Sequence, residues 1–589
     1  MASIDELFKR PNLPPNSGSI KRKFEAPDPQ AVYKAAKLFS TSSPNGYHSN
    51  DAKVEDAEDD DDLEAGPELP REDDEGDDEE GRFFGTGMTK DTAEALDYID
   101  QQDAETYAEE KIDLSWLRRL ANSFQKKVDK NAELRARYED DPAKFMESEA
   151  DLDAEVKSWS LLTEHPELYV ELAKIEGAVA SVVGLLAHEN TDIAIGAIEI
   201  ISELLDEDVQ AGQEQWDALV AALLDADLLE LLMSNLSRLD EENESDRSGV
   251  YHSLAVMENL ASQQSIAEKV GQERVLMWLC NRISKPEKPV SQNKQYAAEV
   301  LQVLLQSSPS LRTKLAIDID GVDLFLRLLS AYRKRDPPKD THEEEYVENL
   351  FDGLTCVVDE SEGKSKFVEA EGVELCLIML REGTKNIMQR ALRVLDHAVG
   401  GQGAPPAGVC EKIVDAAGLK TIFSLLMKKS DSSTVEHLLG IFSALLRLLP
   451  GESAARIRTL AKFTEKDHEK VAKLMGLRND FARRVAVVDK EIRQEQRDMS
   501  DDEIEEREAE WFSRRLDGGL FCLQTIDVIL AWLIAEDKAV KAKVSTELGV
   551  EAGLKPIRAS LEDQMKGLEG GSPEDLDTRE MLETLIGFL

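Results

Sequence analysis

The sequence predicts an all-α protein, and three observations lead to that prediction. Leu, Ala, Glu and Asp dominate a chain of 589 residues in which aromatic residues make up only 6%, a balance typical of helices packed on helices. Apolar residues recur at helical spacing from Ile112 onward. From Ile175 an apolar pattern repeats roughly every 45 to 50 residues, and such units must stack because none can bury its apolar faces alone.

Each repeat has an acidic or polar residue, a Gly, an apolar run with paired leucines, a polar turn and a longer apolar helix. The Gly positions are Gly177, Gly271, Gly321, Gly372 and Gly418, with Asp227 in place of a missing one. We expect Gly177 to permit a sharp turn between the first two helices of its unit, because Gly adopts positive φ without steric cost. Three helices per unit at this spacing predict an armadillo/HEAT-type right-handed α-solenoid over residues 175–450.

Helical regions flank the predicted repeats. Residues 91–174 are expected to form an N-terminal helical cap that is broken at Pro142. Residues 451–589 are expected to form a C-terminal helical extension or cap, with a long charged helix pair over Phe463–Glu510 and an apolar helix over Trp511–Ile534. Within the repeats, the charged, Pro-containing segment at 333–345 and the flexible Gly- and Pro-rich segment at 400–408 predict loops.

Residues 1–90 carry few large apolar side chains, so we expect them to be disordered, since they cannot bury enough surface to offset the entropy of ordering. Lys21, Arg22 and Lys23 form a basic cluster there that resembles a nuclear localisation signal, which would engage an importin for entry into the nucleus. An acidic run follows, with seventeen carboxylates and one Arg between Glu55 and Glu80.

Charge restricts the classes of partner. The formal net charge is −49, which disfavours nucleic acid and anionic membrane, because both are polyanions that need positive patches. A basic protein segment is the natural complement. No apolar stretch is long enough to span a bilayer and no signal-peptide core is apparent, so we expect an intracellular protein with no membrane contact. The five cysteines are widely spaced, which is typical of small buried residues in a reducing compartment.

No catalytic signature is present. The sequence contains no P-loop, H-E-x-x-H, G-x-S-x-G or kinase-type string, and its eight His have no partners at metal-ligand spacing. We therefore expect no catalytic residue, no bound metal and no cofactor. An enzyme on an atypical helical fold is the alternative, and no constellation of residues supports it.

The more informative constellation is acidic. If the third helix of each unit lines the concave face of a solenoid, alignment of the apolar residues brings carboxylates and amides into successive rows: Glu199, Glu203, Glu258, Asn259, Glu299, Asn349, Asp352 and Asp396. Such a ladder could bind Lys and Arg of an extended peptide by charge-assisted hydrogen bonds. The competing interpretation is that these residues form ordinary solvated helix faces.

Several long strings carry a family resemblance. They are DDPAKFMESEADLD (residues 140–153), HENTDIAI (188–195), ENLFDGL (348–354), VLDHAV (394–399), KFTEKDHEKVAKLM (462–475) and RRLDGGLFCLQ (514–524). In this order they resemble the β-catenin-like protein 1 family, eukaryotic nuclear armadillo proteins associated with the spliceosome. The resemblance covers the chain from about residue 91 to its end.

The resemblance implies a nuclear, non-catalytic scaffold of the complex built around the Prp-nineteen ubiquitin ligase. It implies that the partners are basic, nuclear-localisation-like segments of a Myb-domain splicing factor in that complex and of other splicing factors. An importin-like transport adaptor is the alternative. The chain lacks the Trp-x-x-x-Asn ladder of that class, since Ala255 precedes Asn259 and Glu345 precedes Asn349 by four residues. A homodimer is a further expectation, because a solenoid end needs a cap or a second subunit.

Overall fold

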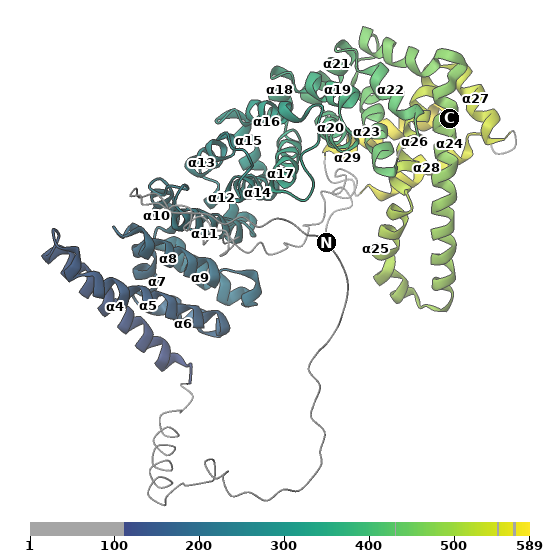
Figure 1. Ribbon diagram of the computed structural model, residues 1–589. Coiled ribbons are helices and arrows are strands. Elements are labelled where there is room, and N and C mark those ends of the chain that lie inside the picture. The colour runs from purple at the N-terminus through teal and green to yellow at the C-terminus, as the bar shows by residue number, and fades with distance from the viewer. Residues whose placement is uncertain (1–110, 430, 550–552, 569–572) are drawn as a thin grey trace, which may run out of the picture. The chain divides into compact units, whose positions relative to one another are not determined.

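The computed structural model describes residues 111–589, apart from residues 430, 550–552 and 569–572. Every regular element in those ranges is a helix (Figure 1). The all-α, armadillo-type class predicted from the sequence is therefore confirmed. The predictions for residues 1–90, including those for Lys21–Lys23, and for residues 91–110 lie outside the described part of the chain.

Six helical triplets make up the repeat region, each with two shorter helices and a longer third one. In chain order they are α6 (Tyr169–Lys174), α7 (Ala178–Gly184) and α8 (Thr191–Leu204); α9 (Gln213–Asp225), α10 (Leu228–Leu236) and α11 (Glu244–Leu260); α12 (Gln264–Val270), α13 (Glu273–Ser284) and α14 (Gln292–Ser307); α15 (Pro309–Ile317), α16 (Gly321–Leu329) and α17 (His342–Val357); α18 (Ser361–Glu369), α19 (Gly372–Glu382) and α20 (Lys385–Val399); α21 (Ala404–Asp415), α22 (Leu419–Met427) and α23 (Ser432–Leu448). Short 3-10 turns at Leu185–Ala187 (η4) and Ser330–Tyr332 (η6) extend α7 and α16.

The third helices pack side by side in chain order, from α8 through α11, α14, α17 and α20 to α23 (Figure 1). First helices likewise pack on first helices, as α6 does on α9 and α18 on α21. Each triplet thus meets its neighbours along the chain, which is how a solenoid buries apolar faces that a single unit would leave exposed. This packing brings the rows of the predicted ladder onto adjacent helices.

The residue with left-handed backbone angles in the turn before each second helix is not always the Gly that the sequence pattern indicates. Gly177 has a φ of 77°, as expected, and Asp227 occupies the same left-handed conformation at 61°. In the last three triplets, however, the left-handed residue precedes the Gly: it is Asp320, Glu371 or Ala417. The following Gly is needed for another reason, because a Cβ at Gly372 would lie 2.3 Å from the ring of Phe367.

The helix α4 (Leu114–Arg137) opens the described region and buries Leu117 and Phe124. Pro142 then starts a 3-10 turn, Pro142–Lys144 (η1), as the Pro at this break predicts. The helix α5 (Met146–Ser158) follows, with the turns Trp159–Glu164 (η2) and Pro166–Leu168 (η3). Because α5 packs on α8, it extends the row of third helices by one helix on the N-terminal side.

The C-terminal region begins with α24 (Ala454–Glu495), which is kinked where Lys466, Asp467 and His468 adopt left-handed backbone angles. A turn at Gln496–Asp498 (η7) leads into α25 (Asp501–Asp517), which packs back against α24. The helix α26 (Leu520–Glu536) packs on α23 and continues the row of third helices. The last helices are α27 (Lys538–Leu548), α28 (Lys555–Gly567) and α29 (Pro573–Phe588).

Two predicted elements differ from the structure. Trp511–Ile534 is two helices, because the chain breaks at Gly519, where φ is 96° and a Cβ would lie 2.5 Å from Phe481. The predicted loop at residues 400–408 is shorter than expected, since α21 begins at Ala404. Prolines are tolerated in the first turn of a helix, where their missing N–H has no partner to lose.

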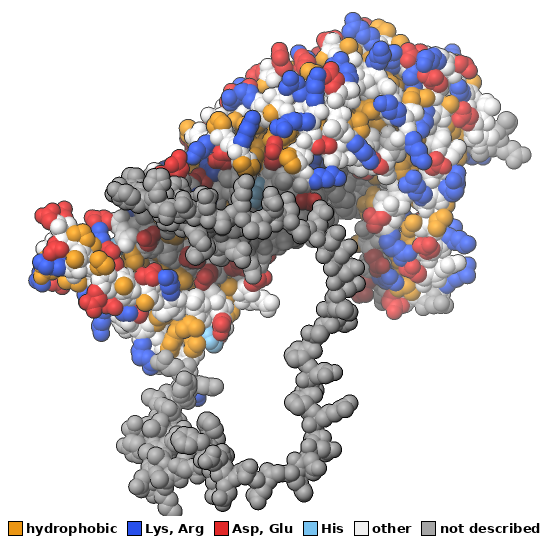
Figure 2. All heavy atoms as spheres, in the orientation of Figure 1, with side chains coloured by type: hydrophobic (Ala, Val, Ile, Leu, Met, Phe, Trp, Pro, Cys, Tyr) orange, Lys and Arg blue, Asp and Glu red, His pale blue; other side chains and the backbone are white. Residues whose placement is uncertain are grey.

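All five cysteines are buried and none forms a disulfide, as expected, and burial raises the pKa of each thiol to about 12. Among the described helices, none alone combines the length and apolarity needed to cross a bilayer. The bent pair Glu506–Asp517 and Leu520–Glu536 meets those criteria only when its two arms, 65° apart, are taken together. On the face seen in Figure 2, acidic, basic and apolar side chains alternate over the repeats.

Candidate peptide-binding ladder

The ladder is built on helices whose starts are fixed by side-chain caps. Asn190 accepts a hydrogen bond from the backbone N–H of Asp192 at the start of α8, and Asn243 caps α11 in the same way. Ser291 caps α14, and its hydroxyl accepts from the backbone of Lys294. Such caps fix where each helix begins, and thereby which residues face the row of third helices.

Glu199 and Glu203 lie one turn apart on α8. The Glu199 side chain is 46% exposed, and its Oε1 lies 3.8 Å from Nε2 of His252 on α11. Burial lowers the pKa of His252, which favours the neutral ring, although Glu199 acts in the opposite direction. Burial also raises the pKa of the half-buried Glu203, and Glu199 and Asp206 raise it further. Two like charges at i and i+4 repel each other, so a cation placed between them would be stabilised by both.

Glu258 and Glu299 occupy the next two helices of the row. Glu258 accepts a hydrogen bond of 2.6 Å from the hydroxyl of Tyr296, and Glu299 accepts one of 3.0 Å from Nε2 of Gln295. Both donors are neutral groups on α14, and these bonds orient the carboxylates. The Tyr296 ring stands 5.1 Å from the ring of Tyr251 on α11, which fixes the donor. Glu199, Glu203, Glu258 and Glu299 therefore lie on three helices that pack in succession, and we call these four residues the acidic row.

The two predicted amides differ in their surroundings. Asn259 is half-buried near the end of α11. Asn349 is half-buried on α17, and its Nδ2 atom is buried without a hydrogen-bond partner among the described residues. Neither amide lies four residues after a Trp, because Ala255 and Glu345 occupy those positions.

Asp352 is already engaged within the fold. Its Oδ1 atom accepts a hydrogen bond of 3.0 Å from Nη1 of Arg393 on α20, and the two side chains are only 14% and 19% exposed. One turn away, Arg390 of the same helix pairs with Glu348 at 2.9 Å. Burial raises the pKa of Asp352, with Arg393 and Arg390 acting against that shift. These two arginines neutralise the row at α17.

Asp396 is also paired with another side chain inside the fold. Its Oδ2 lies 2.9 Å from Nδ1 of His437 on α23, and its side chain is 11% exposed. The carboxylate lies against Gly440, where an added Cβ would be 2.1 Å from Oδ1. Asp396 therefore joins α20 to α23, and the structure argues against a direct role in binding a peptide.

The six carboxylates of the predicted ladder thus fall into two groups, one of four residues and one of two. Glu199, Glu203, Glu258 and Glu299 on α8, α11 and α14 are partly exposed, whereas Asp352 and Asp396 lie in contacts between helices. Sequence reasoning missed the partners Arg390, Arg393 and His437. Each lies 41 or 42 residues along the chain from the carboxylate that it meets, about one repeat away, and only the register between neighbouring third helices decides which side chains meet.

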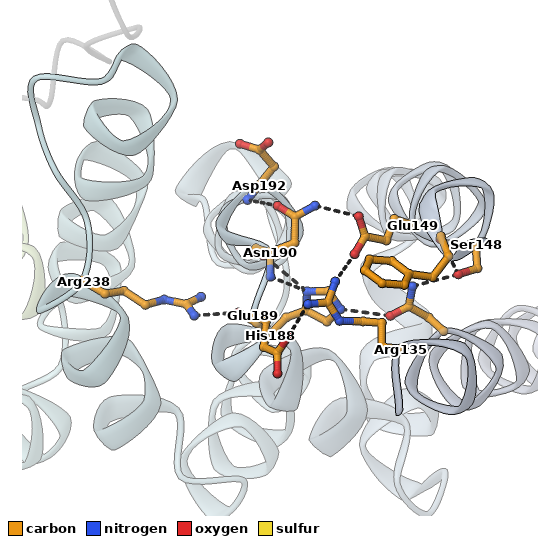
Figure 3. A network of polar contacts seen from close by, with 10 residues as sticks. Arg135, Ser148, Glu149, His188, Glu189, Asn190, Asp192 and Arg238 are labelled. Carbon is orange, nitrogen blue, oxygen red and sulfur yellow. Dashed lines mark hydrogen bonds and ion pairs between the residues drawn. The ribbon is translucent and has the colours of Figure 1, made fainter. Parts of the chain in front are cut away.

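A polar network joins the N-terminal helices to the first repeat (Figure 3). Arg135 of α4 pairs with both Glu149 of α5 and Glu189 in the loop before α8. Asn190 donates a hydrogen bond of 3.1 Å to Glu149 as well. Figure 3 shows Arg135 between these two carboxylates. Glu149 belongs to the string at residues 140–153, and Glu189 and Asn190 to the string at 188–195, so the structure brings two of the resemblance strings together.

The same network extends in both directions. Nε2 of His188 lies 3.1 Å from Oδ1 of Asn131 on α4, and Nδ2 of Asn131 donates to the hydroxyl of Ser148 at 3.0 Å. On the other side, Arg238 donates to the backbone carbonyl of His188 at 2.6 Å and reaches the second repeat. Burial lowers the pKa of His188, so the neutral ring is favoured in this network. The network therefore joins α4 and α5 to the loop before α8 and to the loop that follows α10.

A family model described as "Catenin-beta-like, Arm-motif containing nuclear" matches residues 93–562. The chain belongs to this catenin-β-like family. The β-catenin-like protein 1 homolog of Schizosaccharomyces pombe is 39% identical over 472 residues, which cover 80% of this chain and 81% of that protein. Human β-catenin-like protein 1 is 36% identical over 500 residues, which cover 81% of this chain and 86% of that protein.

A designed armadillo repeat protein in complex with the peptide (KR)4 aligns with 45% of this chain and 99% of its own, with 15% sequence identity and a TM-score of 0.35. The family model and the sequence relatives both support membership in this family.

Proposed function

We propose that this catenin-β-like chain is a non-catalytic nuclear scaffold that binds basic segments of splicing factors through the acidic row on α8, α11 and α14. The observation that carries the proposal is the arrangement of Glu199 and Glu203 beside Glu258 and Glu299 on three helices that pack in succession. The family description as nuclear supports the compartment. Membership in the Prp-nineteen complex and a Myb-domain partner follow from the family resemblance alone.

Energetics favour an extended partner with several cations. Exposed ion pairs contribute only about 0.2 to 1 kcal/mol each, so useful affinity needs several of them at once. Third helices in contact lie about 10 Å apart, a distance that roughly three residues of an extended chain span. Lys or Arg at every second or third position would then meet one carboxylate after another along the row.

Reversal of three charges tests the site. Glu199→Lys, Glu203→Lys and Glu258→Lys together should reduce binding of a labelled peptide of alternating Lys and Arg by at least about tenfold at low salt, if each lost pair contributes near the middle of its usual range. Binding should also weaken steeply with added salt, because screening acts over about 10 Å at 0.1 M. Fluorescence anisotropy measures both effects.

A matched control variant removes carboxylates away from the row. Glu164→Lys, Asp225→Lys and Asp318→Lys change the net charge by the same amount at exposed positions near helix ends. This control should bind the peptide almost as tightly as the wild type. Equal affinity of the ladder variant and the control would refute the site, while a loss in both would mean that only the overall charge attracts the peptide.

The cellular part of the proposal has its own test. Precipitation of the wild-type chain from nuclear extract should recover a Myb-domain splicing factor, and the ladder variant should recover less of it. Replacing Lys21, Arg22 and Lys23 by Ala should weaken nuclear accumulation, as seen by microscopy of a tagged chain. Recovery of importins and transport cargo in place of splicing factors would favour the adaptor class.

A further inference from the structure

In the hairpin of α24 and α25, carboxylates of α24 lie on the side that faces α25, and cations lie on the opposite, outer side. Three carboxylates of α24 face α25: Asp489 pairs with Arg515 at 2.7 Å, Glu491 with Arg514 at 3.4 Å, and Glu495 with Arg514 at 2.8 Å. The indole Nε1 of Trp511 donates a further hydrogen bond of 3.1 Å to Glu495. The acidic residues of this part of α24 are therefore used to hold the hairpin together.

The outer side of α24 is basic. Arg483, Lys490 and Arg493 lie on α24, and Arg497 lies on the η7 turn that follows; all four are exposed. Arg483 is 76% exposed and pairs only with Asp480, at 3.3 Å. Among the described residues, the side chains of Lys490, Arg493 and Arg497 have no ion pair or hydrogen bond. Figure 2 shows Lys and Arg side chains along this outer edge of the hairpin.

Helical spacing places these residues on one face. At about 100° per residue, Arg483, Val487, Lys490 and Arg497 fall within a stripe about 80° wide, and Arg493 lies beside it. The stripe runs for roughly 21 Å at 1.5 Å per residue. Val487 lies within it with 55% of its surface exposed, one of the few large apolar side chains so exposed in the described chain. We call Arg483, Val487, Lys490, Arg493 and Arg497 the basic stripe.

The strong net negative charge of the chain does not cancel this local field. Charges more than about 8 Å apart are largely screened at physiological ionic strength. A partner that approaches the basic stripe therefore senses mainly the four cations and the carboxylates directly beside them. Among the described carboxylates of this part of α24, Asp489, Glu491 and Glu495 are paired with α25 arginines on the inner side, and Asp480 pairs with Arg483.

We propose that the basic stripe docks an acidic amphipathic helix of a partner protein. Cations on both sides of an exposed Val match a helix with carboxylates on both sides of an apolar residue, because one helix face pairs with another at i, i+4 and i+7 positions. A single-stranded nucleic acid is a poorer fit, since residues 482–497 contain no aromatic side chain on which a base could stack. This partner has the opposite charge to the basic segments proposed for the acidic row.

The test uses a designed helical probe and the full chain. The probe carries Glu at the positions that would face the cations and Leu at its centre; the control peptide has the same composition with Glu and Leu scattered around the helix. The wild type should bind the probe in fluorescence anisotropy and bind the scattered peptide more weakly. Lys490→Glu, Arg493→Glu and Arg497→Glu together should weaken probe binding by at least about tenfold, on the usual range for exposed ion pairs. Val487→Ser should weaken it by a smaller factor.

A matched variant controls for overall charge. Lys420→Glu, Lys428→Glu and Lys429→Glu reverse three exposed cations of the α22 region and should leave probe binding unchanged. Circular dichroism melting of all variants checks that the fold is retained. Equal binding of the probe by the stripe variant and the wild type, or equal binding of the two peptides, would overturn the proposal.

Two further outcomes would also overturn it. Tight binding of an oligouridylate that the stripe variant loses, without binding of the probe helix, would assign the face to nucleic acid. A change of molar mass in light scattering between the wild type and the stripe variant would show that a second copy of the chain covers the face. A constant molar mass with selective loss of probe binding supports the proposal.

Discussion

Single residues in this molecule are often constrained by close contacts that the sequence pattern does not reveal. The repeated Gly positions were predictable from spacing, and Asp227 was correctly identified as a substitute. The reason for Gly321, Gly372 and Gly418 was not predictable, because it depends on which side chain packs against each of them. Leu315 and Phe367 fill the space that a Cβ would need at Gly321 and Gly372.

The close contact at Gly440 predicts the effect of a substitution on stability. Gly440→Ala should destabilise the fold by about 1 to 3 kcal/mol, the usual cost of overpacking a tight site, because the new Cβ would displace Asp396 from His437. Denaturant unfolding followed by circular dichroism measures the change. Gly476→Ala in α24 is the control, since nothing lies within 4 Å of its Cβ position; it should stabilise by about 0.5 to 1 kcal/mol. Similar effects of the two substitutions would contradict the proposed role of the contact.

The raised pKa of Glu203 predicts a pH dependence of peptide binding. A carboxyl whose pKa is raised by burial and by Glu199 takes up its proton at a higher pH than an ordinary glutamate, whose pKa is about 4.3. Affinity for the Lys/Arg peptide should therefore fall as the pH is lowered toward that value, and Glu203→Gln should make the dependence shallower. Because His252 also titrates near Glu199, His252→Gln is the second variant to compare. An unchanged pH profile in Glu203→Gln would remove Glu203 from the site.

At the scale of helices, buried cations complete the ends of several third helices. Arg312 donates to the carbonyl of Leu305 near the end of α14 and pairs with Glu360 at 2.7 Å. Arg456 donates to the carbonyl of Leu449 just after α23 and pairs with Glu536. The last carbonyls of a helix lack partners within the helix and carry partial negative charge. Cations inside the fold thus supply partners for carbonyls at the ends of these helices.

Arg312 offers a test of this arrangement. Arg312→Met should lower the free energy of unfolding by roughly 2 to 3 kcal/mol, since hydrogen bonds to a charged group are lost and a buried carbonyl is left without a partner. Arg327→Met is the control, because Arg327 is 69% exposed and pairs only along its own helix; its effect should stay within about 0.5 kcal/mol. Urea unfolding of both variants gives the comparison. Equal effects would mean that the cap contributes little.

Helix identity was more predictable than helix partners. Apolar periodicity predicted the three-helix unit and the long charged pair near the C-terminus, because those signals are local. The pairing of Asp352 with Arg393, or of Arg478 with Asp527 across α24 and α26, depends on how neighbouring helices are set against each other. For that reason four of the six predicted ladder carboxylates remain candidates and two do not.

At the scale of the whole molecule, the row of third helices does not end with the predicted repeats. The helix α26 packs on α23, so residues beyond 450 cover the apolar end of the sixth triplet. The sequence indicated a cap in this region without showing which helix would complete the row. The sequence pattern does not reveal that contact, because α24 and α25 separate α26 from α23 along the chain.

Removal of residues 451–589 should therefore have a large effect. The shortened chain would expose the buried face of α23, including Phe442 and Leu445, and an exposed apolar patch of that kind favours association. We expect the truncated chain to aggregate or to melt at a clearly lower temperature than the full chain, as measured by light scattering and calorimetry. Removal of residues 1–90 is the comparison, and it should leave the melting temperature nearly unchanged. A stable, monomeric truncated chain would contradict the importance of α26.

The attachment of Arg135 to both Glu149 and Glu189 also bears on how the molecule opens. In a stack whose units contact mainly their neighbours, an end unit is released by breaking one interface, whereas an internal unit requires two. Amide hydrogen exchange should therefore begin at the two ends of the row. The acidic row starts on α8, close to one end, and we expect the polar network around Arg135 to delay fraying there. Loss of that clamp would let the distance between Glu199 and Glu258 fluctuate long before the fold itself is lost.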